Sequence, residues 1–239
     1  MPLFLILLAL FISTAYAEDI DYEKVFSSDY ESAVNRIETL KPFIHKECHF
    51  FHTDPAIASA VVFPELIRAS ILRDRIESFG LSMLYVNNGN IYADFSSGIF
   101  QMKPSFLEAI EQRTLCDKRY SDFITIFSYP PGLSEKEQRR ERIERIASNE
   151  WQCRYLAFFM YVVINEFPVE KMSKTDRVLF ISTAYNSGFL KKYEDIERAV
   201  KTEMFPYGRG VPFRQYAYSE VALWYYIHAS RKKDLHSTP

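Results

Sequence analysis

Glycine is scarce in this sequence. It makes up 7 of the 239 residues, or roughly 3%, whereas average globular proteins contain about 7%. A β-sandwich or β-barrel needs a tight turn after each short strand, and such turns depend on residues that adopt positive φ angles. The shortage of glycine therefore argues against an all-β fold. It favours helices joined by short connections.

The chain also lacks an excess of charge of either sign. Its 29 Lys and Arg residues oppose 31 Asp and Glu residues, which gives a net charge of -2. A nucleic-acid binder that depends on bulk positive charge needs a clear basic excess, and an acidic disordered tail needs the opposite. We therefore expect a folded protein with no nucleic-acid partner, and the hydrophobic content of 48% is enough for a sizeable core.

No hydrophobic run reaches the ~20 residues that cross a membrane. The most apolar run, residues 3–12, lies in the uncharged segment 1–17, which ends in the small-x-small sequence Ala-Tyr-Ala. This pattern is typical of a signal peptide and its cleavage site. We predict an exported protein, periplasmic or secreted, with no stable membrane span after cleavage. A retained N-terminal anchor is the alternative, although the segment carries no Lys or Arg.

Cysteine is scarce as well, since the chain holds Cys48, Cys116 and Cys153 and no others. In the oxidising compartment that export implies, these residues form at most one intramolecular disulfide and leave one thiol over. A Cys116–Cys153 disulfide with Cys48 buried is the preferred arrangement. Three free, buried cysteines fit the sequence equally well.

Helix signals dominate the rest of the chain, and no repeat, low-complexity tract or Gly/Ser linker divides it. We predict one domain over 54–239, preceded by a helical arm within 18–53. An Asn-Gly pair flanked by apolar residues predicts a small β-hairpin over 81–97. The expected fold class is mainly α with a small β-hairpin lobe, and the expected helices cover 19–41, 54–80, 104–114, 134–167, 173–188 and 219–230.

Glu65 is the most informative side chain. On the predicted helix 54–80 it shares one stripe with apolar residues, namely Ala58, Val62, Ala69, Leu72, Ile76 and Phe79. Burial disfavours the charged form of a carboxylate and raises its pKa, as a general acid near neutral pH requires. The alternative interpretation is a buried ion pair with Arg68 or another basic side chain, and spacing alone favours that alternative.

Two later segments accompany Glu65. Residues 94–104 read DFSSGIFQMKP, and residues 184–188 read AYNSG. Together with Pro55, ten residues before Glu65, they resemble the motifs of the lysozyme-like lytic transglycosylases. That family has a Pro ten residues before its catalytic Glu, a Gly-Leu-Met-Gln segment followed by Pro, and an Ala-Tyr-Asn-Ala-Gly segment. The resemblance covers residues 54–230, and it departs from the family at Leu66, where a Ser is usual.

The resemblance implies a lysozyme-like fold and cleavage of the β-1,4 bond between N-acetylmuramic acid and N-acetylglucosamine in peptidoglycan, whose glycan strands are then the partner. Glu65 would be the single acid/base: it protonates the glycosidic oxygen and then deprotonates the muramoyl 6-hydroxyl, which forms 1,6-anhydromuramoyl ends. Tyr185 would orient the Glu65 carboxyl, Asn186 would hold the sugar, and Gly98 and Gln101 would line the cleft. No metal or organic cofactor is implied. Plainer roles are core packing for Tyr185 and bonding of a turn for Gln101.

Asp94 decides between two reactions on the same bond. A muramidase that hydrolyses this bond pairs its acid with a second carboxylate. Asp94 is the candidate for this second carboxylate, and its other candidate role is substrate binding in the cleft. An Asp directly before Phe-Ser-Ser-Gly is also a common turn or cap residue. We favour the turn role, and with it a transglycosylase over a hydrolase.

Two non-enzymatic alternatives also have support in the sequence. His45, Cys48, His49 and His52 have the spacing of one helix face and are residue types that bind Zn or Cu. One straight helix rarely surrounds a metal, so packing of this face against the Glu65 helix is the favoured interpretation. The other alternative is a catalytically silent wall-binding protein with a lysozyme-like shape, which would use the aromatic and arginine-containing stretch 205–214.

Overall fold

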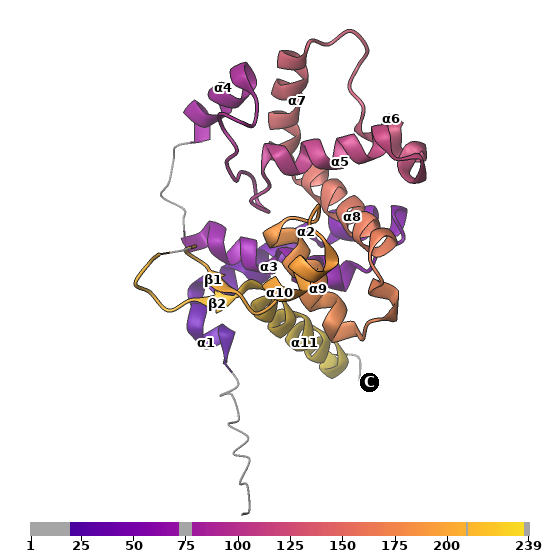
Figure 1. The fold of residues 1–239 in the computed structure, drawn as a ribbon. Helices are drawn as coiled ribbons and strands as arrows, with labels where there is room; N and C mark the ends of the chain where they lie inside the picture. The colour runs from indigo at the N-terminus through magenta and orange to yellow at the C-terminus, as the bar shows by residue number, and fades with distance from the viewer. Residues whose placement is uncertain (1–19, 72–77, 209, 237–239) are drawn as a thin grey trace, which may run out of the picture.

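The computed structural model describes residues 20–71, 78–208 and 210–236. The predicted signal peptide lies outside these residues. The described chain is mainly α, as predicted (Figure 1). Its α-helices are α1 (Tyr22–Phe26), α2 (Ser28–Phe50), α3 (Pro55–Ile71), α4 (Ser78–Asn88), α5 (Pro104–Cys116), α6 (Ile124–Phe127), α7 (Glu135–Ala147), α8 (Asn149–Glu166), α9 (Lys174–Ser187), α10 (Tyr193–Ala199) and α11 (Tyr218–His236).

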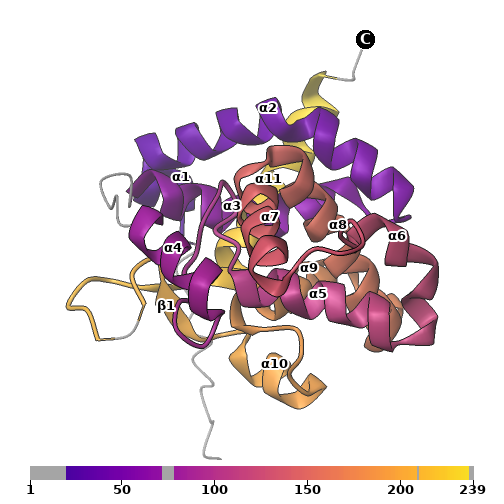
Figure 2. The ribbon, with the colours of Figure 1, turned by 90° about the horizontal axis from the view of Figure 1, so that it is seen from above.

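Helix α3 forms the centre of the core. Every residue from 57 to 67 is buried, which is the pattern of a helix that other elements enclose on all sides. Helices α2, α9 and α11 pack against α3, and α8 also contacts it. Figure 2 shows α2 running along one side of the molecule, and it continues through Pro42 to Phe50. The predicted arm is therefore longer than 19–41 and contributes to the same core as α3.

A second group of helices, α4 to α7, forms a lobe beside this core (Figure 1). The β-hairpin predicted over 81–97 is wrong, because α4 extends to Asn88. Gly89 has a φ of 86° and donates its N–H to the Tyr85 carbonyl at 2.7 Å. The Asn-Gly pair thus ends a helix, a position that requires positive φ as much as a hairpin turn does. The antiparallel pair of strands in the described chain is instead β1 (Glu203–Phe205) with β2 (Tyr216–Ala217).

The predicted helix 134–167 is divided at Ser148. The Ser148 backbone is extended, and its side chain caps α8 by accepting a hydrogen bond from the Trp151 N–H. Helix α7 begins with a capping box formed by Ser134 and Glu137. The corner between α7 and α8 brings Ile146 and Gln152 against the segment that precedes α5.

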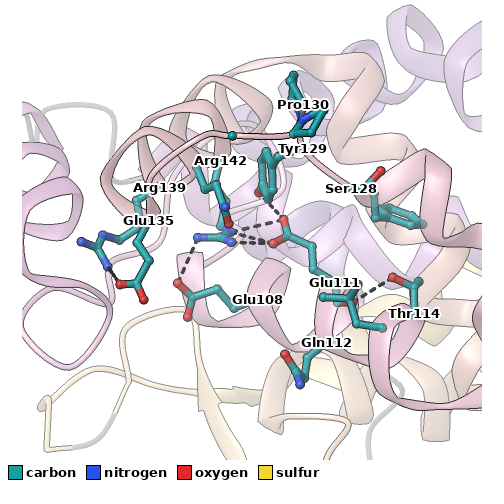
Figure 3. Close-up of a pocket in the computed structure, with 15 residues that line it drawn as sticks. Glu108, Glu111, Gln112, Thr114, Ser128, Tyr129, Pro130, Glu135, Arg139 and Arg142 are labelled. Carbon is teal, nitrogen blue, oxygen red and sulfur yellow. Dashed lines mark hydrogen bonds and ion pairs between the residues drawn. The ribbon is translucent and has the colours of Figure 1, made fainter.

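A buried polar network holds the lobe together, and it lies beside a pocket of about 530 Å³ (Figure 3). Arg142 of α7 donates from Nε to both carboxylate oxygens of Glu111 on α5, at 3.2 and 3.0 Å. The hydroxyls of Tyr129 and Tyr155 donate to the same carboxylate at 2.6 and 2.7 Å, and Arg142 also reaches Glu108 at 3.1 Å. Because both arginine and glutamate are buried and paired, the network fixes α5 relative to α7 and α8.

Within the described residues, no helix is both long enough and apolar enough to cross a membrane.

Candidate active site

A cleft of about 630 Å³ lies where residues of the core and of the lobe meet. Its walls come from α3, from residues 94–109 of the lobe, and from the end of α9 with the loop that follows. Five of the six residues predicted for the site line this cleft, although they are far apart in the chain. They are Glu65, Asp94, Gln101, Tyr185 and Asn186.

Glu65 lies on α3 with its side chain 4% exposed, as the sequence predicts for a buried carboxylate. Arg68, one turn later, donates from Nη1 to both Glu65 oxygens at 2.7 and 2.8 Å. Arg68 is itself fixed by a hydrogen bond from Nε to the Pro206 carbonyl at 3.2 Å. Its guanidinium also lies over the Phe205 ring at 5.2 Å. The ion pair foreseen as the alternative role of Glu65 is therefore present.

Burial raises the pKa of Glu65 above 4.5, because the carboxylate has lost its hydration. The positive charge and hydrogen bonds of Arg68 act in the opposite direction, as does a hydrogen bond with Tyr218. The loss of hydration is the largest of these effects, so the net direction is upward. A carboxyl in this setting holds a proton at a higher pH than an exposed glutamate does.

Two tyrosines flank Glu65, the half-buried Tyr185 and the buried Tyr218, and Tyr185 differs in role from the prediction. Tyr185 donates its hydroxyl to the Phe100 carbonyl at 2.8 Å. The tyrosine whose hydroxyl acts on the pKa of the Glu65 carboxyl is Tyr218, and it donates that hydroxyl to the Val61 carbonyl at 2.8 Å. Burial and the nearby Glu65 charge raise the pKa of both tyrosines well above 10. Both hydroxyls therefore stay protonated at neutral pH.

The segment that carries Gly98 and Gln101 is a tight turn. Gln101 has a φ of 50° and donates from Nε2 to the Gly98 carbonyl at 3.0 Å, which is the turn role given above as its plainer alternative. Phe100, between them, is fully buried and donates its N–H to Gln152 at 2.8 Å. The Phe100 carbonyl accepts from Tyr185, so both the N–H and the carbonyl of Phe100 are hydrogen-bonded. These two bonds fix the turn to α8 and to α9.

Gly98 is not among the residues that line the cleft. Its φ is 74°, and a Cβ atom there would lie 2.3 Å from Gln152 Nε2 and 2.5 Å from the Ile146 carbonyl oxygen. Glycine is required at this position because Gln152 occupies the space, rather than because a ligand approaches. The sequence could not show this, since Gln152 lies 54 residues further along.

We expect Gly98→Ala to lower the free energy of unfolding by about 2 to 3 kcal/mol, from the positive φ and from the forced displacement of Gln152. Gly132→Ala is the matched control, because Gly132 has a φ of 89° and open space around it. The control should lose only the conformational part, about 1 kcal/mol. Urea unfolding of both variants measures the difference, and equal losses would show that the Gln152 contact is unimportant.

Asp94 caps helix α5. Its two carboxylate oxygens accept from the Ser105 N–H at 3.1 Å and the Ser105 hydroxyl at 2.8 Å, and Lys103 lies 3.6 Å away. Among the cleft-lining residues that the structure describes, Glu65 and Asp94 are the carboxylates. Asn186, at the end of α9, is exposed on the cleft wall.

In the described chain, the predicted cluster on α2 and in the loop directly after it is not assembled as a metal site. Cys48 is buried in the core, whereas His45, His49 and His52 are exposed. Over residues 20–71, 78–208 and 210–236, no three His, Cys, Asp or Glu side chains are grouped as metal ligands would be. The metal-binding alternative thus has no assembled ligand set within the described residues.

All three cysteines are free thiols, so the preferred Cys116–Cys153 disulfide is not formed. Cys116 is exposed at the end of α5, and Cys153 is buried on α8. Burial raises the pKa of Cys48 to about 11 and that of Cys153 to about 12. Both buried thiols are therefore protonated and weakly reactive at neutral pH.

Comparison with known proteins yields no match to a family model, a curated protein or a solved structure. The functional argument therefore depends on the geometry of the cleft.

Proposed function

We propose that this protein is a peptidoglycan lytic transglycosylase in which Glu65 acts as the single acid/base. The observation that carries the proposal is the convergence of the buried carboxylate with residues from 94–104 and 184–188 on one cleft. Those two segments resemble the family motifs on sequence alone. The position of both segments beside Glu65 in the folded chain is an observation independent of the resemblance, because the spacing of the three segments in the sequence does not require them to meet.

The chemistry needs one carboxyl that changes its protonation state twice. Protonated Glu65 donates to the glycosidic oxygen as the bond to the muramoyl C1 breaks, and the resulting carboxylate removes the proton of the 6-hydroxyl, which closes the 1,6-anhydro ring. Burial supports the first step because it raises the pKa of the Glu65 carboxyl. The second step requires no base other than the carboxylate that the first step leaves behind.

Asp94 favours this internal reaction over hydrolysis. In a hydrolase the second carboxylate activates water or attacks the sugar, and it must be free to do so. Both Asp94 oxygens already accept hydrogen bonds from Ser105, the second residue of α5. This pairing supports a structural role for Asp94 at the rim of the cleft.

Asp94→Asn is therefore expected to retain activity within a few-fold of the wild type. The variant should lose about 1 kcal/mol of stability, because a neutral amide oxygen accepts the hydrogen bond of the Ser105 N–H more weakly than a carboxylate does. The initial rate of glycan release tests the expected activity, and urea unfolding tests the expected loss of stability. A loss of 100-fold or more in rate, with the fold intact, would instead assign Asp94 to a hydrolytic mechanism.

A second candidate function is non-catalytic binding of the cell wall. The Glu65–Arg68 pair favours it, because a carboxylate with both oxygens bonded to a cation is ionised and cannot donate a proton in that state. In this alternative the cleft would hold a glycan strand without cutting it.

One experiment separates the two functions. The purified protein is incubated with insoluble peptidoglycan, and the sugar released into solution and the protein retained on the pellet are measured separately. The transglycosylase predicts steady release of soluble fragments at catalytic amounts of protein. Retention without release, over walls of several compositions, would support the binding protein. Neither retention nor release would reject both.

A further inference from the structure

The Glu65–Arg68 pair is incompatible with acid catalysis as it stands. Both Glu65 oxygens accept from the same Nη1 group of Arg68, at 2.7 and 2.8 Å. To protonate a glycosidic oxygen, one of these oxygens must carry a proton and face the sugar. If the proposed function is right, Arg68 has to leave the carboxylate before the bond is cut.

Arg68 lies on the solvent side of the pair. Its side chain is 21% exposed and that of Glu65 is 4% exposed, and both line the cleft. Beyond Glu65, Arg68 is bonded to the Pro206 carbonyl and stacks on the ring of Phe205. A group that enters the cleft therefore has access to the guanidinium, and the contacts with Pro206 and Phe205 do not depend on the Glu65 bond.

The cleft is suited to an anionic ligand. Lys103 and Lys191 line it together with Arg68, and Lys191 is exposed. Against these three cations stand Glu65 and Asp94, and Asp94 is already bonded to Ser105. An arginine binds a carboxylate through two parallel hydrogen bonds, so a carboxylate on a ligand competes directly with Glu65 for Arg68.

We propose that Arg68 is a positioning residue that a carboxylate of the substrate, on the muramoyl lactyl group or on the peptide stem, draws away from Glu65. This inference rests on the proposed function and names the chemical feature that the cleft recognises. Glu65 then loses its cation and gains a nearby anion, and both changes favour the protonated carboxyl. The proton comes from solvent, so binding of the substrate and uptake of one proton are coupled.

The other groups that act on Glu65 do not replace this effect. Tyr218 of α11 acts on the pKa of the Glu65 carboxyl, and the charge of Glu65 acts on the pKa of Tyr185 of α9. Both tyrosines are neutral at the pH of the experiment. Within the described chain, Arg68 on α3 is the cation whose charge acts on Glu65, so its displacement governs the protonation state.

Calorimetric titration in two buffers of different ionisation enthalpy measures the protons taken up on binding. Three probes without a cleavable muramoyl bond are compared at neutral pH. The disaccharide N-acetylglucosaminyl-N-acetylmuramic acid carries the lactyl carboxylate, its tetrapeptide derivative carries stem carboxylates, and tri-N-acetylchitotriose is neutral. We expect proton uptake with one or both carboxylate probes, which identifies the source of the carboxylate, and none with chitotriose.

Two variants make the test specific. Arg68→Gln should bind the carboxylate probe about 10-fold or more weakly, because a hydrogen bond between charged groups is lost, and should take up no proton. Its affinity for chitotriose should not change, which also shows that the variant is folded. Glu65→Gln should bind the carboxylate probe at least as tightly as the wild type, because Arg68 has no competing carboxylate, and should take up no proton.

Carboxylate binding without proton uptake, or uptake of the same size in Arg68→Gln, would overturn the inference. If peptidoglycan is still cut in a Glu65-dependent way, the proposed function survives that result. If no probe binds and peptidoglycan is neither retained nor cut, the proposed function fails, and the inference fails with it.

Discussion

Replacement of Glu65 by glutamine is expected to lower the rate of glycan release by about 10² to 10⁴-fold. The amide neither donates a proton to the glycosidic oxygen nor accepts one from the 6-hydroxyl, so both steps lose their catalyst. The variant keeps the size and shape of the side chain, which lies in the buried stretch 57–67 of helix α3. The initial rate of fragment release from purified peptidoglycan measures the effect.

Glu47→Gln is the matched control for this variant. Glu47 is also buried, lies on a core helix, and is paired with an arginine, since Arg154 donates to its two oxygens at 3.0 Å each. It is not among the residues that line the cleft. The control should keep its activity within a few-fold despite some loss of stability. Equal losses in the two variants would mean that a buried carboxylate matters only for folding, and would contradict the catalytic role of Glu65.

Arg142→Ala is expected to reduce the free energy of unfolding by about 3 to 5 kcal/mol, because it removes the guanidinium that is hydrogen-bonded to the buried Glu111 carboxylate. Glu111 would keep the uncharged hydroxyls of Tyr129 and Tyr155, and Arg145 lies 4.0 Å from it, too far for a hydrogen bond. The bridge from α7 to both Glu108 and Glu111 of α5 would be lost (Figure 3). Urea denaturation of the variant and the wild type gives the difference.

Arg198→Ala provides the comparison at an exposed ion pair. Arg198 bonds Asp195 one turn earlier on α10, but its side chain is 77% exposed. An exposed pair of this kind contributes about 0 to 1 kcal/mol. A loss in Arg142→Ala no larger than in Arg198→Ala would show that the network does not hold the lobe together.

The sequence predicts helix ends and the burial of Glu65, because both depend on residues that are close together in the chain. The helices predicted over 104–114 and 173–188 agree with α5 and α9. Pro104 lies in the first turn of α5, and Ser173 and Gly188 cap the two ends of α9, and such residues act on their own helix. The burial of Glu65 also agrees, since it follows from the apolar residues around it on one helix.

Contacts between distant segments could not be predicted in the same way. Tyr218 meets Glu65 from 153 residues away, and no spacing rule connects them. Glycine is needed at position 98 only because the corner between α7 and α8 places Gln152 against it. At Gly89 the local rule itself was ambiguous, because the positive φ of an Asn-Gly pair fits a helix end as well as a hairpin turn. The hairpin prediction failed for that reason.

The most direct test of the central claim is the mass of the glycan ends that the wild-type protein releases from purified peptidoglycan. A transglycosylase forms 1,6-anhydromuramoyl ends, which are lighter than reducing ends by one water molecule, and these ends should be absent after treatment with Glu65→Gln. Reducing ends in their place would contradict the internal attack by the 6-hydroxyl and assign the cut to a hydrolase.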